Sequence, residues 1–147
     1  MKFRAWDKSD RVMCKVAYLK LSEVQYMNVG YRKNINGKTI DENALLDENL
    51  SGTCVLMRYT GKHDMAGKEV YEGDVIENPA GIRMEIKYGL YDAYCPADRC
   101  NMDSVGFYAA GVGLPEMPIG CLEEHDKKGS NGSCGNASLY IHEPWGN

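Results

Sequence analysis

Apolar and charged residues alternate along several stretches of the chain. The pattern is most regular over residues 82–88, Ile-Arg-Met-Glu-Ile-Lys-Tyr, where four apolar residues alternate with three charged residues. A strand that packs one face against a core and leaves the other in water shows this two-residue period. Residues 2–6 alternate in the same way, and residues 53–59 and 137–142 are further strand candidates. The chain is therefore expected to form antiparallel β-sheets.

Turn-forming residues separate the candidate strands. Residues 34–38 and 78–81 contain Asn, Gly and Pro, which favour tight turns. Residues 11–21 are apolar with a mixed period that fits a strand or a helix, and the acidic start of residues 41–46 favours one short helix. The expected fold class is mainly β, or β-rich α+β: a small SH3-like barrel or sandwich with at most one or two short helices.

Length and composition fit a single globular domain. A chain of 147 residues can bury about 68–70% of the surface that its unfolded form exposes, so its core needs no metal or disulfide. Ten Tyr stand against two Phe and two Trp. Tyr favours half-buried strands and interfaces, because its ring packs while its hydroxyl stays in water. Tyr-rich strands with unpaired edges favour self-association, so a homo-oligomer is expected.

The net charge of −4 is unevenly distributed along the chain. Residues 1–76 carry 12 Lys/Arg and 11 Asp/Glu, whereas residues 77–147 carry 5 and 10. Phosphate binding needs a positive face. This balance therefore disfavours a predominantly basic nucleic-acid binder and leaves room for a local basic patch in the first half.

The sequence offers no targeting or membrane segment. Residues 1–7 contain no apolar run of signal-peptide length, and no later segment approaches the ~20 apolar residues of a membrane span. An intracellular protein without a membrane partner is expected. Its six Cys are then reduced thiols rather than a disulfide framework.

Two motifs in the first half of the chain resemble those of the YopX family of phage and prophage proteins. Residues 56–76, LMRYTGKHDMAGKEVYEGDVI, are similar to its signature: a strand ending in Tyr-Thr-Gly, a charged loop with Asp and Gly, then Lys-Glu-Ile/Val-Tyr-Glu-Gly-Asp and a strand. Residues 1–7, MKFRAWD, resemble the usual start of the family. Most of the signature is structural in character, since Gly61 and Gly73 suit positive φ and Asp74 suits a turn.

The resemblance implies a domain plan and an origin. It predicts a single YopX-like domain over 1–147, with a signature hairpin region at 56–88. Residues 89–147 would form a divergent Gly/Cys-rich elaboration, including a mobile loop at 126–136. It also implies a phage- or prophage-encoded accessory protein, in the cytoplasm of a bacterial host cell. The expected role is non-enzymatic binding of a host protein or a small nucleotide ligand, and the alternative is a nucleic-acid-binding small β-barrel.

The signature loop carries the candidate binding residues. Cations interleaved with aromatic rings can stack on nucleobases or clamp a phosphate, as in single-strand binders. A solvated hairpin loop is the alternative interpretation of the same pattern. The candidates are Arg58, Tyr59, Lys62, His63, Lys68 and Tyr71.

A zinc site is the second chemical candidate. Cys95 and Cys100 have a C-x4-C spacing, and Cys121 and His125 have a C-x3-H spacing. Four N/S donors in two close pairs could bind zinc tetrahedrally. Structural zinc sites favour C-x2-C, however, so free thiols that pack as small apolar residues are the competing interpretation. No other cofactor is expected.

Catalytic motifs are missing from the sequence. The chain has no Gly-x-Ser-x-Gly elbow, and its Cys and His residues lie in no local signature of a nucleophile. Residues 106–113 are Gly-rich but lack the Lys-Ser/Thr of a P-loop, so these glycines are expected to form turns. The sequence therefore predicts a protein that is not an enzyme.

Overall fold

The computed structural model describes residues 2–22, 26–78, 80–95, 97–119 and 140–142. Within these ranges the regular elements are β-strands, so the mainly β fold class is confirmed. The short helix expected at residues 41–46 is wrong, because these residues belong to strand β4 (Lys38–Leu46). Ala44 and Leu46 are buried while their neighbours are exposed, which is a strand period. Pairing with the preceding strand outweighs the helical start signal. No helix in the described ranges is long and apolar enough to cross a membrane.

The chain divides into two compact units with separate hydrophobic cores. Unit 1 contains residues 2–59 of the described chain, and unit 2 contains its described residues from 60 onward. Strand β5 (Cys54–His63) contributes its first six residues to unit 1 and its last four to unit 2. The predicted single domain, with an elaboration from residue 89, stays a prediction.

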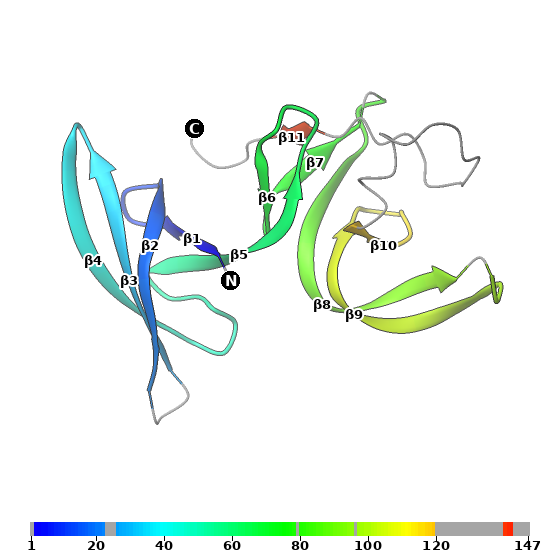
Figure 1. Cartoon of the computed structure of the whole chain (residues 1–147), viewed down its shortest axis with the longest axis horizontal. Helices are drawn as coiled ribbons and strands as arrows, with labels where there is room; N and C mark the ends of the chain where they lie inside the picture. Colours follow the sequence, from blue (N-terminus) through cyan, green and yellow to red (C-terminus); the bar gives the residue numbers. More distant parts are fainter. Residues whose placement is uncertain (1, 23–25, 79, 96, 120–139, 143–147) are drawn as a thin grey trace. The chain divides into compact units, whose positions relative to one another are not determined.

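Unit 1 is an antiparallel sheet with the strand order β4-β3-β2-β1-β5 (Figure 1). The other strands are β1 (Phe3–Asp7), β2 (Val12–Leu21) and β3 (Met27–Ile35). The predicted turn at 34–38 is confirmed: Asn36 and Gly37 have φ of 52° and 82°. Two successive positive φ values are those of a type I′ hairpin turn, which Asn-Gly favours. This turn sets the register of β3 against β4.

The core of unit 1 lies on one face of this sheet. Strand β2 carries an extra residue, Ala17, where the pairing with β3 shifts between Val16 and Tyr18. Because of this bulge, Val16 and Leu19 both face the core although their spacing is odd. The ambiguous segment 11–21 is thereby resolved as a strand. The buried core residues are Ala5, Cys14, Val29, Tyr31, Ala44, Leu46, Cys54 and Leu56.

Unit 2 contains a short hairpin and a five-stranded sheet. Strand β6 (Glu69–Tyr71) follows the end of β5. The sheet has the order β10-β9-β8-β7-β11, and its strands are β7 (Val75–Glu77), β8 (Arg83–Cys95), β9 (Cys100–Ala110), β10 (Met117–Pro118) and β11 (Tyr140–His142). Its core contains Val70, Ile76, Met84, Ile86, Ala109 and Ile119.

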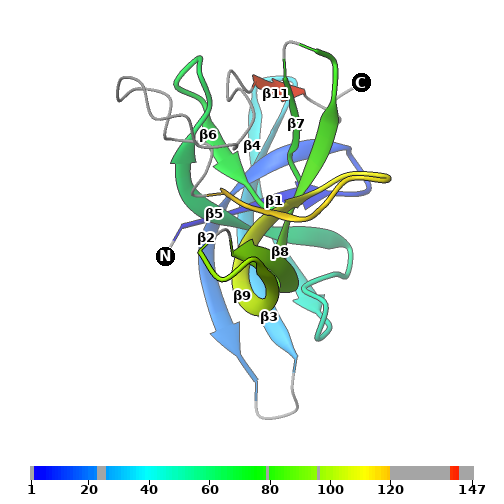
Figure 2. The same cartoon turned by 90° about the vertical axis from the view of Figure 1, so that its right-hand side faces the viewer.

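The long β8–β9 hairpin corrects two expectations. The strand predicted at 82–88 is confirmed but continues seven residues further, to Cys95. Gly106 lies inside β9, where a turn was expected, and is paired with Gly89. Both glycines have positive φ, 146° and 157°, which other residues rarely adopt. The two strands curl together through this region (Figures 1 and 2), so the glycines bend the sheet instead of ending it.

Two further predictions concern where strands β5 and β11 begin and end. The strand predicted at 53–59 is present but continues to His63, so the charged loop of the signature begins after that residue. The strand expected at 137–142 is present at Tyr140–His142. The mobile loop predicted at 126–136 lies outside the described residues.

Candidate binding surface

The signature loop is held by its own polar groups. The Asp64 carboxylate accepts hydrogen bonds from the backbone N–H groups of Ala66, at 2.9 Å, and Lys68, at 2.8 Å. The Thr60 hydroxyl donates to the carbonyl oxygen of Val70 at 2.7 Å. Such bonds satisfy backbone groups that a turn leaves without ladder partners. These polar residues therefore have a structural role in the hairpin.

The Glu-Gly-Asp turn fastens β6 and β7 to β8. The Asp74 side chain, only 1% exposed, accepts a hydrogen bond from the Tyr71 N–H at 2.8 Å. Gly73 has a φ of 86° and donates to the Ile86 carbonyl, while the Ile86 N–H donates to the Asp74 carbonyl, both at 2.8 Å. The predicted turn at 72–74 is confirmed. Asp74, the acidic residue of this turn, is buried and has a structural role.

The six binding residues predicted from the sequence are divided between the two units. Arg58 and Tyr59 belong to unit 1, and Lys62, His63, Lys68 and Tyr71 belong to unit 2. Tyr71 is only 7% exposed, and its hydroxyl donates to Glu69 at 2.9 Å. Tyr59 lies under the Lys2 ammonium, 5.4 Å from the ring centroid, as in a cation–π pair. A joint binding role for the six stays a prediction, and the Tyr71 ring is mostly buried.

A buried ionic centre lies at one end of the unit 1 core. The Asp7 and Lys33 side chains are 3% and 7% exposed, and their charged atoms are 3.3 Å apart. The Tyr31 hydroxyl donates to the same Asp7 oxygen at 2.7 Å. Lys33 also forms ion pairs with Asp10 and Glu42. Every charge in the centre therefore has an opposite partner, as burial requires.

The environment of this centre shifts its ionisation. Burial by itself raises the pKa of Asp7, but hydrogen bonds from the Asp10 N–H, the Tyr31 hydroxyl and the Lys33 ammonium outweigh it and lower the pKa. The hydrogen bond to Asp10 raises the pKa of Lys33, against the opposing effect of burial. Both groups are held in their charged forms at neutral pH. This is a stabilising ion pair, not a poised acid or base.

The two core thiols of unit 1 are unreactive in character. Burial, followed by the nearby Asp7 charge, raises the pKa of Cys14 above its ordinary value. The same two causes raise the pKa of Cys54 to about 11. A thiol must ionise to act as a nucleophile. Cys14 and Cys54 therefore behave as small apolar core residues.

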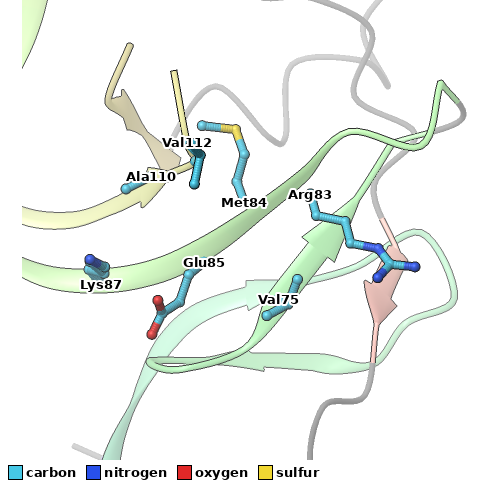
Figure 3. A pocket seen from close by; sticks show the side chains of 8 residues that line it. Val75, Arg83, Met84, Glu85, Lys87, Ala110 and Val112 are labelled. Carbon is cyan, nitrogen blue, oxygen red and sulfur yellow. The ribbon is translucent and has the colours of Figure 1, made fainter. Parts of the chain in front are cut away.

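An open pocket of about 400 Å³ lies on unit 2, along β8 (Figure 3). At its edge, Arg83 forms an ion pair with Glu77 of β7, at 2.8 Å. That guanidinium is therefore already engaged by a carboxylate. The pocket has no deeply buried polar group to orient a ligand, since its buried lining side chain is that of Met84. The lining residues are Val75, Arg83, Met84, Glu85, Lys87, Ala110, Gly111 and Val112.

The predicted zinc ligands are only partly within the described chain. Cys95 and Cys100 are directly opposite Cα partners at the end of the β8–β9 hairpin, and Cys100 is an exposed free thiol. Cys121 and His125 lie outside the described residues. The described ranges contain no cluster of three or more His, Cys, Asp or Glu side chains suited to a metal. The four-ligand zinc site stays a prediction.

The face of the unit 1 sheet opposite the core is basic. Paired residues of neighbouring antiparallel strands lie on one face, and successive residues alternate between faces. Ala5 and Cys14 are paired and buried, so Arg4 and Lys15 lie on the opposite face, which we call the outer face. Its members in β1 to β4 are Arg4, Trp6, Met13, Lys15, Tyr18, Lys20, Asn28, Gly30, Arg32, Asn34, Thr39, Asp41, Asn43 and Leu45.

One row of this outer face places three cations side by side. Arg4 is paired with Lys15, and Lys15 is paired with Arg32. The Arg32 guanidinium then donates to Asp41 through Nε at 2.8 Å and Nη2 at 3.4 Å, which lowers the pKa of Asp41. Lys20 adds a fourth cation two residues beyond Tyr18. Among its members in β1 to β4, the outer face therefore has four cations and one carboxylate.

The Tyr18 ring lies flat on the sheet. A Cβ placed on Gly30, its paired residue, would be 2.2 Å from Cε1 and 2.5 and 2.6 Å from the two adjacent ring atoms. These nearly equal distances put that point above the face of the ring, since a point in the ring plane would be much farther from the adjacent atoms. The hydroxyl reaches across β3 and donates to the Asn43 Oδ1. One ring face therefore covers Gly30, and the side chain remains 48% exposed.

The bulge in β2 explains why the outer face was missed. The outward residues Met13, Lys15, Tyr18 and Lys20 do not share one two-residue period, because Ala17 interrupts it. The partners Arg4, Gly30 and Arg32 are distant in the sequence and meet Lys15 and Tyr18 only through pairing. The pairing of Gly30 with Tyr18 marks the place where the ring lies on the sheet. This pair becomes apparent only when the register of β2 against β3 is known.

Comparison with known proteins agrees with the two sequence motifs. A family model described as "YopX protein" matches residues 2–109, which is more than half of the chain. No curated protein matches the chain. Among solved structures, the chain is similar to "Crystal structure of protein EF1440 from Enterococcus faecalis", with 22% identity over 77% of this chain and 78% of that chain, and a TM-score of 0.46. The chain therefore belongs to the YopX family.

Proposed function

We propose that this YopX-family protein acts by binding, without catalysis, and that it holds an anionic partner on the outer face of unit 1. The observation that carries the proposal is charge segregation. A chain with a net charge of −4 places four cations and one carboxylate on this face. Such a face attracts anions even when the whole protein is acidic, because nearby charges dominate the local potential.

The arrangement of the cations supports a binding role. Lys15 and Arg32 are direct cross-strand neighbours, and like charges opposite one another destabilise a sheet. Arg32 is also paired with Asp41, and an anionic partner beside Lys15 would add a second opposite charge to this row. The predicted partners, a host protein with an acidic surface or a nucleotide, both have the required charge.

The described core of unit 1 uses its ionisable side chains for stability. Its buried acid and its buried lysine stabilise one another, and its thiols are shifted away from ionisation. A phage or prophage origin and self-association belong to the same proposal. They fit an accessory protein that acts by occupying a partner's surface.

Retention of the full chain on a heparin column tests the proposal. Replacing Lys15 and Lys20 together by Ser should lower the salt concentration of elution. The matched control replaces Lys38 of β4 and Lys87 of unit 2 by Ser, which changes the net charge equally at sites off the outer face. If both variants elute at an equally lowered salt concentration, the anion-binding surface is not on the outer face. A wild-type protein that is not retained at low salt would contradict the function.

A further inference from the structure

We infer that the anionic partner of the outer face is a single-stranded nucleic acid, with a base stacked on the Tyr18 ring. This inference rests on the proposed function and names the class of partner. It follows from the position of a flat, partly exposed aromatic ring among the cations. Bases of a single strand have free faces, whereas those of a duplex are already stacked on one another.

The Tyr18 ring is held in one orientation before any ligand binds. One of its faces covers Gly30, where a side chain larger than hydrogen would collide with the ring. Its hydroxyl is held by Asn43 on the next strand but one. A ring fixed at both ends loses little conformational freedom when a ligand stacks on it. Tyr18 is 48% exposed. The ring face that does not cover Gly30 is therefore the one on which a base would stack.

Lys15 and Lys20 lie before and after the Tyr18 ring along β2. The outward residues of β2 are, in order, Met13, Lys15, Tyr18 and Lys20. A strand rises about 3.3 Å per residue, so the two lysines lie within roughly 10 Å of the ring position along β2. Nucleic-acid strands present phosphates beside each base, and a groove that combines cations with aromatic rings is the usual non-specific single-strand site.

The same features argue against an acidic protein as the partner. Carboxylates would pair with Lys15, Lys20 and Arg32 but gain nothing specific from a flat ring. A nucleobase uses both the charge and the ring. The two partners therefore predict different effects for a substitution at Tyr18, and this difference gives the test.

Fluorescence anisotropy with two short labelled strands of equal length separates charge from stacking. One strand is a thymidine oligonucleotide, and the other has the same phosphates with abasic sugars. We expect wild-type protein to bind the thymidine strand more tightly. Tyr18→Ala should weaken that binding about 5- to 100-fold and leave abasic binding nearly unchanged, whereas Tyr18→Phe should retain most of it.

Salt titration provides a second measurement. Lys15→Ser should lower the slope of log K against log salt, on both strands, by about 0.7 for each phosphate that the variant no longer binds. The control Lys38→Ser should not change the slope. Thermal unfolding of each variant verifies that it is folded, and Tyr18→Phe keeps the ring if Tyr18→Ala is unstable.

The outcomes distinguish this inference from the proposed function. Equal binding of the thymidine and abasic strands, or equally tight binding of a duplex, overturns base stacking while anion binding stands. Retention on heparin with no binding of either strand also overturns only the inference. Failure to bind heparin and both strands at low salt overturns both.

Discussion

Gly30 decides how Tyr18 lies on the outer face of unit 1. The ring occupies the position that a Cβ on Gly30 would take, and the two residues are paired across β2 and β3. Gly normally weakens a strand because it has no side chain to pack. Here the neighbouring aromatic ring supplies that packing.

This contact makes the effect of Gly30→Ala depend on residue 18. In the wild-type background the new methyl group collides with the ring, and we expect the free energy of unfolding to fall by about 1–3 kcal/mol. In a Tyr18→Ala background the same change should be neutral or stabilising by about 0.5–1 kcal/mol, because Ala restricts the unfolded chain more than Gly does. Urea denaturation of the four proteins measures the coupling. Equal effects in both backgrounds would contradict the packing of the ring on Gly30.

The ion pair of Asp7 and Lys33 is the other residue-scale determinant. Removing one partner leaves the other buried without compensation. Lys33→Met should therefore lower the free energy of unfolding at pH 7 by about 3 kcal/mol. The exposed Lys38 provides the control Lys38→Met, which should change stability by less than about 0.5 kcal/mol.

The cost of Lys33→Met should depend on pH with a defined sign. The pKa of Asp7 is lowered in the folded protein, so its contribution is present above the unfolded pKa and is lost as pH falls through the folded pKa. The difference between wild type and variant should thus shrink in acid, where Asp7 becomes neutral. The raised pKa of Lys33 keeps its contribution intact up to its ordinary pKa and removes it only at higher pH. A difference that grows as pH falls below about 4 would show that Asp7 is not the charge that Lys33 compensates.

At the scale of elements, one inserted residue shapes the unit 1 sheet. Ala17 is extra relative to β3, since Val16 is paired with Tyr31 and Tyr18 with Gly30. The residues on both sides of the bulge keep their proper faces. Without Ala17 they would alternate regularly, with Val16 inward, Tyr18 outward and Leu19 inward.

Deletion of Ala17 should consequently leave the protein folded, because every β2 residue keeps its face. Deletion of Arg32 should unfold unit 1, because β3 pairs with β4 without an extra residue that could absorb the change, and a one-residue slip moves an apolar set from the core to water. That loss of several kcal/mol is comparable with the whole stability of a small protein, about 5–15 kcal/mol. Near-UV and far-UV circular dichroism of the two deletion variants would show the difference. An unfolded Ala17 deletion would mean that the bulge itself is required.

At the scale of the whole molecule, acidic and basic residues are sorted along the chain. Residues 1–59 carry ten Lys/Arg and seven Asp/Glu, whereas residues 60–147 carry seven and fourteen. Pairing then places four of the cations on one face of unit 1. This sorting lets an acidic protein present a basic surface.

Self-association is a whole-molecule prediction. Edge strands such as β4 have unpaired backbone groups that can pair with another chain. We expect native mass spectrometry of the full chain to show a multiple of the monomer mass whose population rises with protein concentration. A monomer across the accessible concentration range would contradict this prediction.

The zinc hypothesis predicts one bound metal ion per chain. Cys100→Ser removes a predicted ligand and should weaken zinc binding by at least about tenfold, given that losing even an outer partner of a metal ligand costs 10- to 100-fold. The control His63→Asn removes an exposed His outside the predicted set and should have no effect. Competition with a chromophoric chelator measures the affinity. Metal-free protein after incubation with zinc would leave the cysteines as free thiols.

Local sequence patterns were sufficient to identify the family, the β class and two of the turns. These patterns are the alternation over 82–88, Asn36-Gly37 in its turn, and the Glu-Gly-Asp motif whose acid bonds a neighbouring backbone N–H. Each requires only residues close together in the chain. The same local reasoning failed at 41–46, where an acidic start resembles a helix N-terminus but pairing with β3 makes a strand.

Which residues share a surface depends instead on how distant strands pair. Arg4, Lys15 and Arg32 form one row because of strand register, and Tyr18 lies flat because Gly30 is opposite. Register joins segments far apart in the chain, and the bulge at Ala17 hides the alternation that would have indicated it. Net charge cannot reveal such a face either, since it sums over all surfaces. Thus the chain that composition marked as a poor anion binder contains a basic, aromatic surface.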